Sequence, residues 1–136
     1  MPVAPSDLKQ ALAPTGVLRA SINLGNPVLA QGSVGNPCGV TVDLARSIAD
    51  ELDVPVSFVC FDAARSSYGA LAGGEADIAF LAIEPVRAEQ VAFTAPYVII
   101  DGVFVVPVGS TVTSVADVDH VGVRIGVKHG SATTCT

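Results

Sequence analysis

Arg87 is the residue of this sequence whose type and position best suit the binding of a small carboxylate. It lies one turn into a short predicted helix that begins at Glu84-Pro85, soon after the apolar stretch 76–82. A guanidinium can hold a carboxylate through two parallel hydrogen bonds, and free N–H groups at a helix start add positive potential. The spacing equally fits an exposed arginine that pairs with Glu84 or Glu89 on its own helix, so both interpretations stay open.

Other polar and aromatic residues follow predicted strands, where a ligand could reach them. Asn23 and Asn26 come after the first predicted strand, although asparagine is also common in turns. Ser131 follows Gly130 after the last predicted strand, where a helix start could bind an anion or could simply be capped by the serine. Phe80 could form the wall of a pocket or belong to the core.

Catalytic and metal-binding patterns are scarce in the sequence. His120 and His129 have no Ser or Cys partner nearby in the sequence, and no P-loop, G-x-S-x-G or zinc-ligand spacing occurs. The three cysteines, Cys38, Cys60 and Cys135, lie far apart without C-x-x-C spacing. We therefore predict no catalytic residues, no metal ligands and no cofactor.

Composition limits the remaining classes. The chain has 136 residues, of which 50% are hydrophobic and 15% are charged, which favours one ordered domain with a real core. The net charge of −6 and the lack of a Lys/Arg cluster argue against nucleic-acid binding. No apolar run reaches the roughly 18 residues of a membrane span. The first residues do not resemble a secretory signal, so either a signal has been removed or the protein stays in the cytoplasm.

The elements that must position these residues alternate between strands and helices. We expect strands at 17–24, 54–61, 76–82 and 123–128, and one strand, or two with a kink at Asp101-Gly102, over 97–108. We expect helices at 6–12, 41–52, 66–72 and 84–90, a helical turn at 114–117 and a loop at 30–38. Such alternation predicts an α/β fold in three layers, with a mostly parallel sheet and helices on both faces. Ligands of such sheets bind beyond the carboxyl ends of the strands, where the candidate residues lie.

At these same segments the chain resembles the extracytoplasmic (periplasmic) solute-binding proteins of polar amino-acid ABC transporters, family 3. The most specific stretch is R-x-x-x-V-x-F-T-x-P-Y from Arg87 to Tyr97, and further similarity lies at 39–52, 71–80 and 115–132. The resemblance implies the type 2 periplasmic-binding-protein fold, in which two lobes close on a solute. It also implies that Arg87 binds a ligand α-carboxylate, that Ala82 faces the ligand, that Ser131 meets it from the second lobe, and that Asn23 and Asn26 lie in loops that touch it.

The chain departs from the family pattern at two ligand-facing positions and near its end. The family usually has a hydroxyl residue where Ala82 stands and a threonine where Glu84 stands. Similarity also stops after Ala132, which predicts an incomplete first lobe over 1–108 and a hinge with the beginning of a second lobe over 109–136. We expect the predicted strand 123–128 to pair with a second copy, which gives a homodimer with swapped or added strands.

Three functions are compatible with these observations. The first is binding of a small carboxylate or amino acid, with an ABC-transporter permease as a further candidate partner. The second is a truncated α/β module that dimerises and binds no solute. The third is an enzyme that resembles cyclohexadienyl dehydratase, in which a buried Glu84 beside Arg87 would act as acid or base. We expect the first, and we expect no enzyme activity; the compartment stays open between periplasm and cytoplasm.

Overall fold

The computed structural model describes residues 6–132 of the chain. Contacts between residues divide it into two compact units, Met1–Phe93 and Thr94–Thr136. This division comes earlier in the chain than the predicted lobe boundary at residue 108. The assignment of the units to two lobes stays a prediction.

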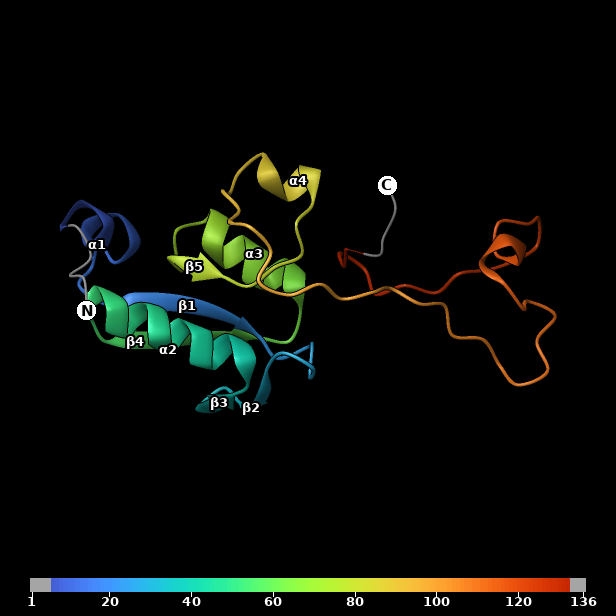
Figure 1. Cartoon of the computed structure of the whole chain (residues 1–136), viewed down its shortest axis with the longest axis horizontal. Coiled ribbons are helices and arrows are strands. Elements are labelled where there is room, and N and C mark those ends of the chain that lie inside the picture. The colour runs from blue at the N-terminus through green and yellow to red at the C-terminus, as the bar shows by residue number, and fades with distance from the viewer. Residues whose placement is uncertain (1–5, 133–136) are drawn as a thin grey trace. The chain divides into compact units, whose positions relative to one another are not determined.

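A parallel sheet forms the centre of the first unit (Figure 1). Strand β1 (Leu18–Asn23) lies between β4 (Val56–Phe61) and β5 (Ile78–Ala79), and both neighbours run parallel to it. The predicted parallel sheet is therefore confirmed. Strand β5 is shorter than the strand expected at 76–82, because only Ile78 and Ala79 pair with β1.

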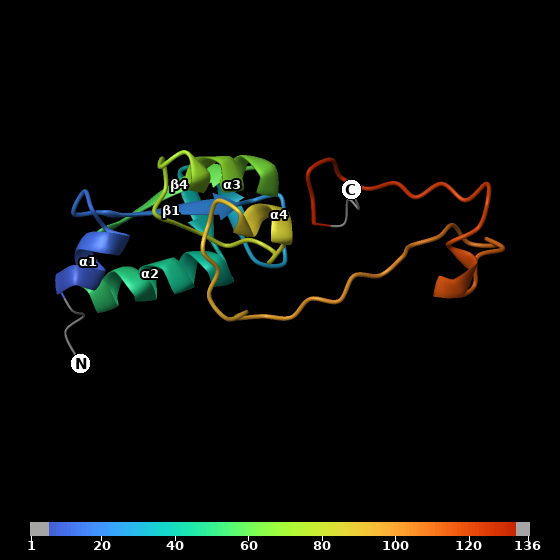
Figure 2. The same cartoon turned by 90° about the horizontal axis from the view of Figure 1, so that it is seen from above.

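Helices cover both faces of this sheet, as Figure 2 shows for α2 (Val40–Leu52) and α3 (Ala64–Ala72). Side chains of a strand alternate between its faces, and β1 follows this rule. Ala20 and Ile22 pack with Val42 and Ala45 of α2. Ser21 points the other way and contacts Ser67 of α3. The predicted three-layer α/β architecture is thus confirmed.

Small side chains set how closely α2 approaches the sheet. The helix buries Val42, Ala45, Ala49 and Leu52 along the side that faces the sheet. The two alanines lie at the centre of the buried face because they leave room for the strand side chains. Beyond Leu52 the helix ends in a left-handed residue, Asp53, with a φ angle of 51°.

Two short elements at the start of the chain complete the first unit. Helix α1 (Ser6–Leu12) precedes Ala13, which packs with Leu18, Ala49 and Leu52 in a second core cluster. Strands β2 (Gln31–Ser33) and β3 (Asn36–Cys38) form an antiparallel hairpin, so the prediction of a loop over 30–38 is wrong. The Gly, Ser, Asn and Pro residues there are typical of turns, and nothing in their pattern reveals that two three-residue strands pair.

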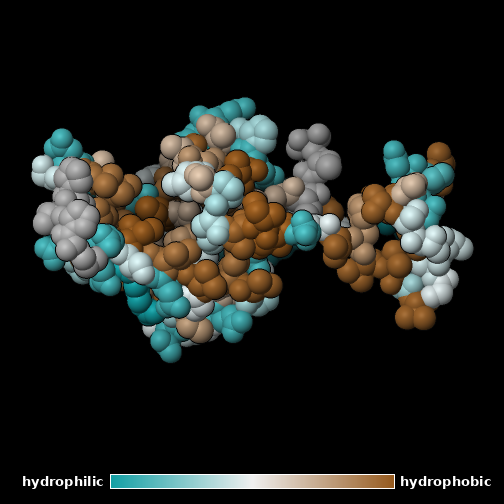
Figure 3. Space-filling view, in the orientation of Figure 1, coloured by the Kyte–Doolittle hydropathy of each residue, from teal (hydrophilic) through white to brown (hydrophobic). Residues whose placement is uncertain are grey.

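The second unit contains no strand within residues 94–132, so the predicted strands 97–108 and 123–128 are absent. The predicted turn at 114–117 is present as a 3-10 helix, η1 (Val115–Asp117), with its capping box. Apolar side chains are exposed along the unit, for example Ile99 at 77%, Val105 at 90% and Val121 at 108% (Figure 3). A β-branched stretch becomes a strand only where another strand accepts its hydrogen bonds, and no such partner lies beside it in the described chain. The helix expected after Gly130 falls mostly outside the described residues.

Candidate ligand-binding site

The predicted ligand side of the sheet is the edge at which its parallel strands end. Asn23, the last residue of β1, lies opposite Phe61, the last residue of β4. Strand β5 ends at Ala79, which pairs with Ser21, and the chain then continues into α4 (Pro85–Ala88). The loop after β1 and the segment before α4 therefore leave the sheet at the same edge, as predicted.

Arg87 is the charged residue that the first unit buries most completely as a whole residue among those described, with 6% of the residue exposed. Its Nε lies 2.8 Å from Oε2 of Glu84, and its Nη1 donates to the carbonyl oxygen of Ala82 at 3.3 Å. The expected pairing of Arg87 with Glu84 is thus present, but the arginine is not exposed. Because α4 has only four residues, the pair owes its geometry to Pro85 at the helix start and to the i,i+3 spacing, not to a helix dipole.

Glu84 and Ala82 form the more open part of this cluster. The Glu84 side chain is 26% exposed, compared with 8% for the Arg87 side chain. Ala82 is exposed, and its methyl group cannot take part in hydrogen bonds, so its carbonyl oxygen is the polar group at this position. The cluster can donate hydrogen bonds from a guanidinium and accept them on a carboxylate and a carbonyl.

Asn23 and Asn26 both shape the loop after β1. The Oδ1 atom of Asn23 accepts from the backbone N–H of Gly25 at 3.0 Å, and Oδ1 of Asn26 accepts from Val28 at 3.3 Å. These are the local turns in which asparagine is common. The loop also approaches the chain after β4 closely, since a Cβ atom on Gly25 would lie 2.1 Å from the carbonyl oxygen of Asp62.

Phe80 and Ser131 are the remaining predicted site residues. Phe80 is partly buried and packs against the core cluster around Ile22 and Val42, which agrees with the alternative that it belongs to the core. Ser131 belongs to the second unit, where its backbone N–H donates to the carbonyl oxygen of Lys128. The ligand contacts predicted for all six residues stay predictions.

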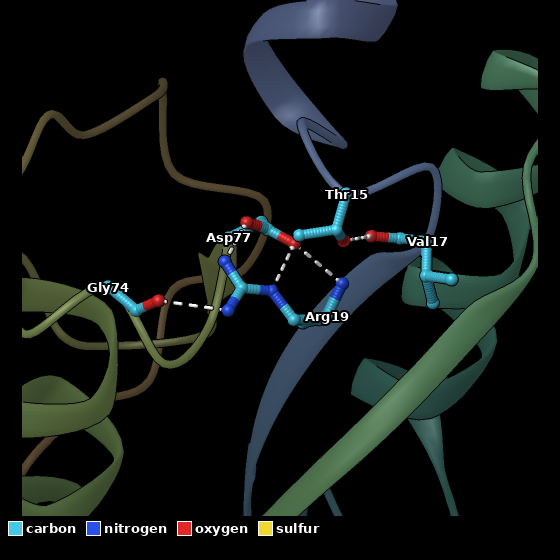
Figure 4. A network of polar contacts seen from close by, with 5 residues as sticks. All are labelled: Thr15, Val17, Arg19, Gly74 and Asp77. Carbon is cyan, nitrogen blue, oxygen red and sulfur yellow. Dashed lines mark hydrogen bonds and ion pairs between the residues drawn. The ribbon is translucent and has the colours of Figure 1, made fainter.

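The sequence analysis missed a polar network at the opposite end of the sheet (Figure 4). Asp77, just before β5, accepts hydrogen bonds from the backbone N–H, Nε and Nη2 of Arg19 in β1, at 2.8, 3.0 and 2.6 Å. Arg19 also donates from Nη1 to the carbonyl oxygen of Gly74 at 2.9 Å. Burial alone would raise the pKa of Asp77, but the hydrogen bonds and charge of Arg19 outweigh it and lower that pKa. This network fixes β5 beside β1.

A second missed pair consists of two buried hydroxyl groups beneath α3. The Oγ atoms of Ser21 and Ser67 lie 2.7 Å apart, and both residues are fully buried. Ser21, a serine within the apolar strand β1, could have signalled an internal hydrogen bond, because buried hydroxyl groups need partners. Both missed networks stabilise the fold that carries the site.

Two other kinds of feature, a metal centre and a membrane-spanning helix, are absent from the described part of the chain. Residues 6–132 contain no group of three or more His, Cys, Asp or Glu residues that could hold a metal ion. None of the helices described in that range has both the length and the hydrophobicity of a membrane span. Cys60 is a partly buried thiol with a raised pKa, because burial disfavours its thiolate.

Comparisons with known proteins place this geometry in a family context. Residues 22–134 match the family of bacterial extracellular solute-binding proteins, family 3. No curated protein sequence gave a match.

Two solved structures resemble the chain. One is the crystal structure of the ancestral amino acid-binding protein AncCDT-1, a precursor of cyclohexadienyl dehydratase, with 26% sequence identity and a TM-score of 0.57. The other is described as an ancestral cationic amino acid solute-binding protein, AncCDT-1, with 28% identity and a TM-score of 0.57. Each match covers 67% of this chain and 41% of the other, so the chain spans about two fifths of those proteins. Since the family match extends over most of its length, the chain belongs to the bacterial extracellular solute-binding proteins of family 3.

Proposed function

We propose that this chain binds a small polar solute with a carboxylate group, an amino acid or a related acid, as part of an ABC-transporter substrate-binding protein. The observation that carries the proposal is the burial of Arg87 at the edge where the parallel strands end. A guanidinium carries five N–H donors, so a ligand carboxylate at this edge can bind it alongside Glu84 and the carbonyl oxygen of Ala82. The amino-acid ligands named for both similar structures support the same class of solute.

Thermal unfolding with the standard amino acids and small carboxylic acids tests this proposal. A ligand that binds only the folded chain stabilises it by about 2.7 kcal/mol when its concentration is a hundred times Kd. We expect at least one amino acid to raise the melting temperature of the natural chain. Arg87→Ala should remove this increase, and Arg87→Lys should reduce it because a lysine cannot form the bidentate contact.

Arg46→Ala is the matched control. Arg46 lies on α2 with its side chain 50% exposed and pairs with the exposed Asp43. Its loss should leave the ligand-induced shift unchanged. A screen without any stabilising ligand, or a shift that survives Arg87→Ala, would contradict the proposal.

The same cluster supports a second candidate function, dehydratase-like catalysis on cyclic acids. Glu84 contacts Arg87 and is only partly exposed, and one similar structure is named as a precursor of cyclohexadienyl dehydratase. In this alternative Arg87 would hold the substrate carboxylate and Glu84 would transfer a proton. Turnover of prephenate that disappears in Glu84→Gln would favour the enzyme, whereas binding without turnover favours the solute-binding function.

We also propose two macromolecular partners. Exposed apolar residues of the second unit, such as Val103, Val105 and Ile125, support contacts with a second copy of the chain. Size-exclusion chromatography with light scattering should then report a dimer, and a monomer at all concentrations would contradict it. Membership of the family supports an ABC-transporter permease as the other partner.

A further inference from the structure

The carboxylate of Glu84 is the outer half of the buried ion pair. Arg87 binds it through Nε at 2.8 Å, and the side-chain exposures are 8% for Arg87 and 26% for Glu84. A solute that approaches the pair from solvent therefore meets negative charge more readily than positive charge. An arginine that carries its own acidic partner differs from an isolated anion-binding residue, because the pair has no net charge.

A simple anion is a poor match for such a pair. Its carboxylate and that of Glu84 would share one guanidinium, so the two negative groups would lie within a few ångströms of each other. Like charges at that distance repel strongly where water is partly excluded. Bringing a second negative charge to the pair would also leave one carboxylate without compensation.

A solute with an ammonium group beside its carboxylate avoids this penalty. An ammonium group has three donors and no acceptor, so it must find acceptors in the site. Glu84 offers a carboxylate, and the carbonyl oxygen of Ala82, which lies 3.3 Å from Nη1 of Arg87, offers a second acceptor. The methyl side chain of Ala82 adds no competing donor or acceptor. The bound cluster of four charged groups is then neutral.

We propose that Glu84 is the specificity-determining residue of the site and selects solutes that carry an ammonium group next to the carboxylate. The site therefore binds these solutes in preference to hydroxy acids and keto acids that have the same side chain. This inference rests on the proposed function of Arg87, and it adds which class of carboxylate the site accepts.

Isothermal titration calorimetry with matched ligand pairs tests the inference on the whole chain. Each amino acid that binds is compared with its α-hydroxy acid: L-alanine with L-lactate, L-phenylalanine with L-phenyllactate, and L-arginine with argininic acid. We expect the natural chain to bind the amino acid at least about tenfold more tightly, a ratio equivalent to one charge contact. Glu84→Gln should narrow this ratio about tenfold by weakening the amino acid and strengthening the hydroxy acid.

Two further variants make the result specific to Glu84. Glu84→Asp keeps the charge and should keep the preference. Glu51→Gln removes an exposed carboxylate near the carboxyl end of α2, at the opposite end of the sheet, and should leave the ratio unchanged. Circular dichroism checks that each variant is folded.

The outcomes separate this inference from the proposed function. Equal affinity of the natural chain for both members of a pair overturns the role of Glu84 while solute binding stands, and this comparison needs no variant. An undiminished preference in a folded Glu84→Gln variant overturns it in the same way. If no amino acid, hydroxy acid or keto acid binds the natural chain, the proposed function fails and the inference fails with it.

Discussion

Replacing Asp77 by asparagine should destabilise the first unit by about 2–3 kcal/mol at neutral pH. The carboxylate of Asp77 is only 5% exposed and accepts three hydrogen bonds from Arg19. A hydrogen bond to a charged group contributes about 1.5–3 kcal/mol to stability. The three bonds together therefore set only a high upper limit on what Asp77 contributes to the free energy of unfolding. The Arg19 side chain is 28% exposed, so water can replace part of what it loses, and most of the ion-pair contribution must be discounted. What remains is the loss of negative charge beside Arg19 and the NH2 group that asparagine places against an Arg19 donor, since the asparagine oxygen can still accept from the Arg19 backbone N–H.

Urea unfolding followed by far-ultraviolet circular dichroism measures this loss. Helices α2 and α3 belong to the first unit, so the helical signal reports on the part of the chain that Asp77 stabilises. Asp43→Asn is the control, because Asp43 pairs with Arg46 on the surface with its side chain 73% exposed. We expect the control to change the free energy of unfolding by less than about 0.5 kcal/mol.

The pH dependence gives an independent check. The pKa of Asp77 is lowered in the folded chain from its ordinary value of 3.8. A lowered pKa means that the contribution of Asp77 is fully present above the unfolded-state pKa and is lost as the pH falls through the folded-state pKa. The natural chain should therefore lose its advantage over Asp77→Asn only in acid, below about pH 4. Equal stability of the two proteins at neutral pH, or a difference that does not shrink in acid, would refute the reasoning.

Two further predictions concern local geometry. Gly25→Ala should destabilise the first unit by about 1–3 kcal/mol, because its Cβ would lie 2.1 Å from the carbonyl oxygen of Asp62. Gly35→Ala is the control, because a Cβ atom at Gly35 would have nothing within 4 Å. In the same urea assay this control should change the free energy of unfolding far less. Asp117→Asn should loosen the turn at η1, because Oδ2 of Asp117 accepts four hydrogen bonds from Thr113 and Ser114 that lower its pKa. The protection of the Ser114 amide against hydrogen exchange, relative to an unstructured peptide at the same pH, should fall in this variant at neutral pH. In the natural chain this protection should fall only once acid protonates Asp117, and unchanged protection in the variant would contradict this role.

Several elements of the fold were predictable because their signals are local. The apolar stretches near 18–23 and 56–61 and the helical pattern near 40–52 became β1, β4 and α2 within a few residues. Alternation of such elements was enough to predict a parallel sheet with helices on both faces. The prediction of a strand over 97–108 was wrong because strand formation there depends on a distant partner. β-Branched residues form a strand only when another chain segment accepts their hydrogen bonds.

The candidate site shows the same division between local and long-range information. Spacing alone allowed Arg87 to pair with Glu84, since residues three apart on a helix are neighbours. It could not reveal that the arginine is buried or that the carboxylate is its more exposed partner. Asn23 and Asn26 were found by their position after β1, but their hydrogen bonds within the loop became visible only in the structure.

The sequence by itself determined the family and the α/β class and proposed Arg87 as the residue that holds a carboxylate, because residue types, periodicity and motif spacing are properties of the chain alone. Only the tertiary structure decided which polar groups became buried partners. Arg19 and Asp77 are 58 positions apart, Ser21 and Ser67 are 46 apart, and both pairs form because parallel strands and their crossover helices bring distant segments together. Burial, and with it the degree to which the charges of Arg87 and Glu84 are exposed, depends on that packing and not on the order of residues along the chain.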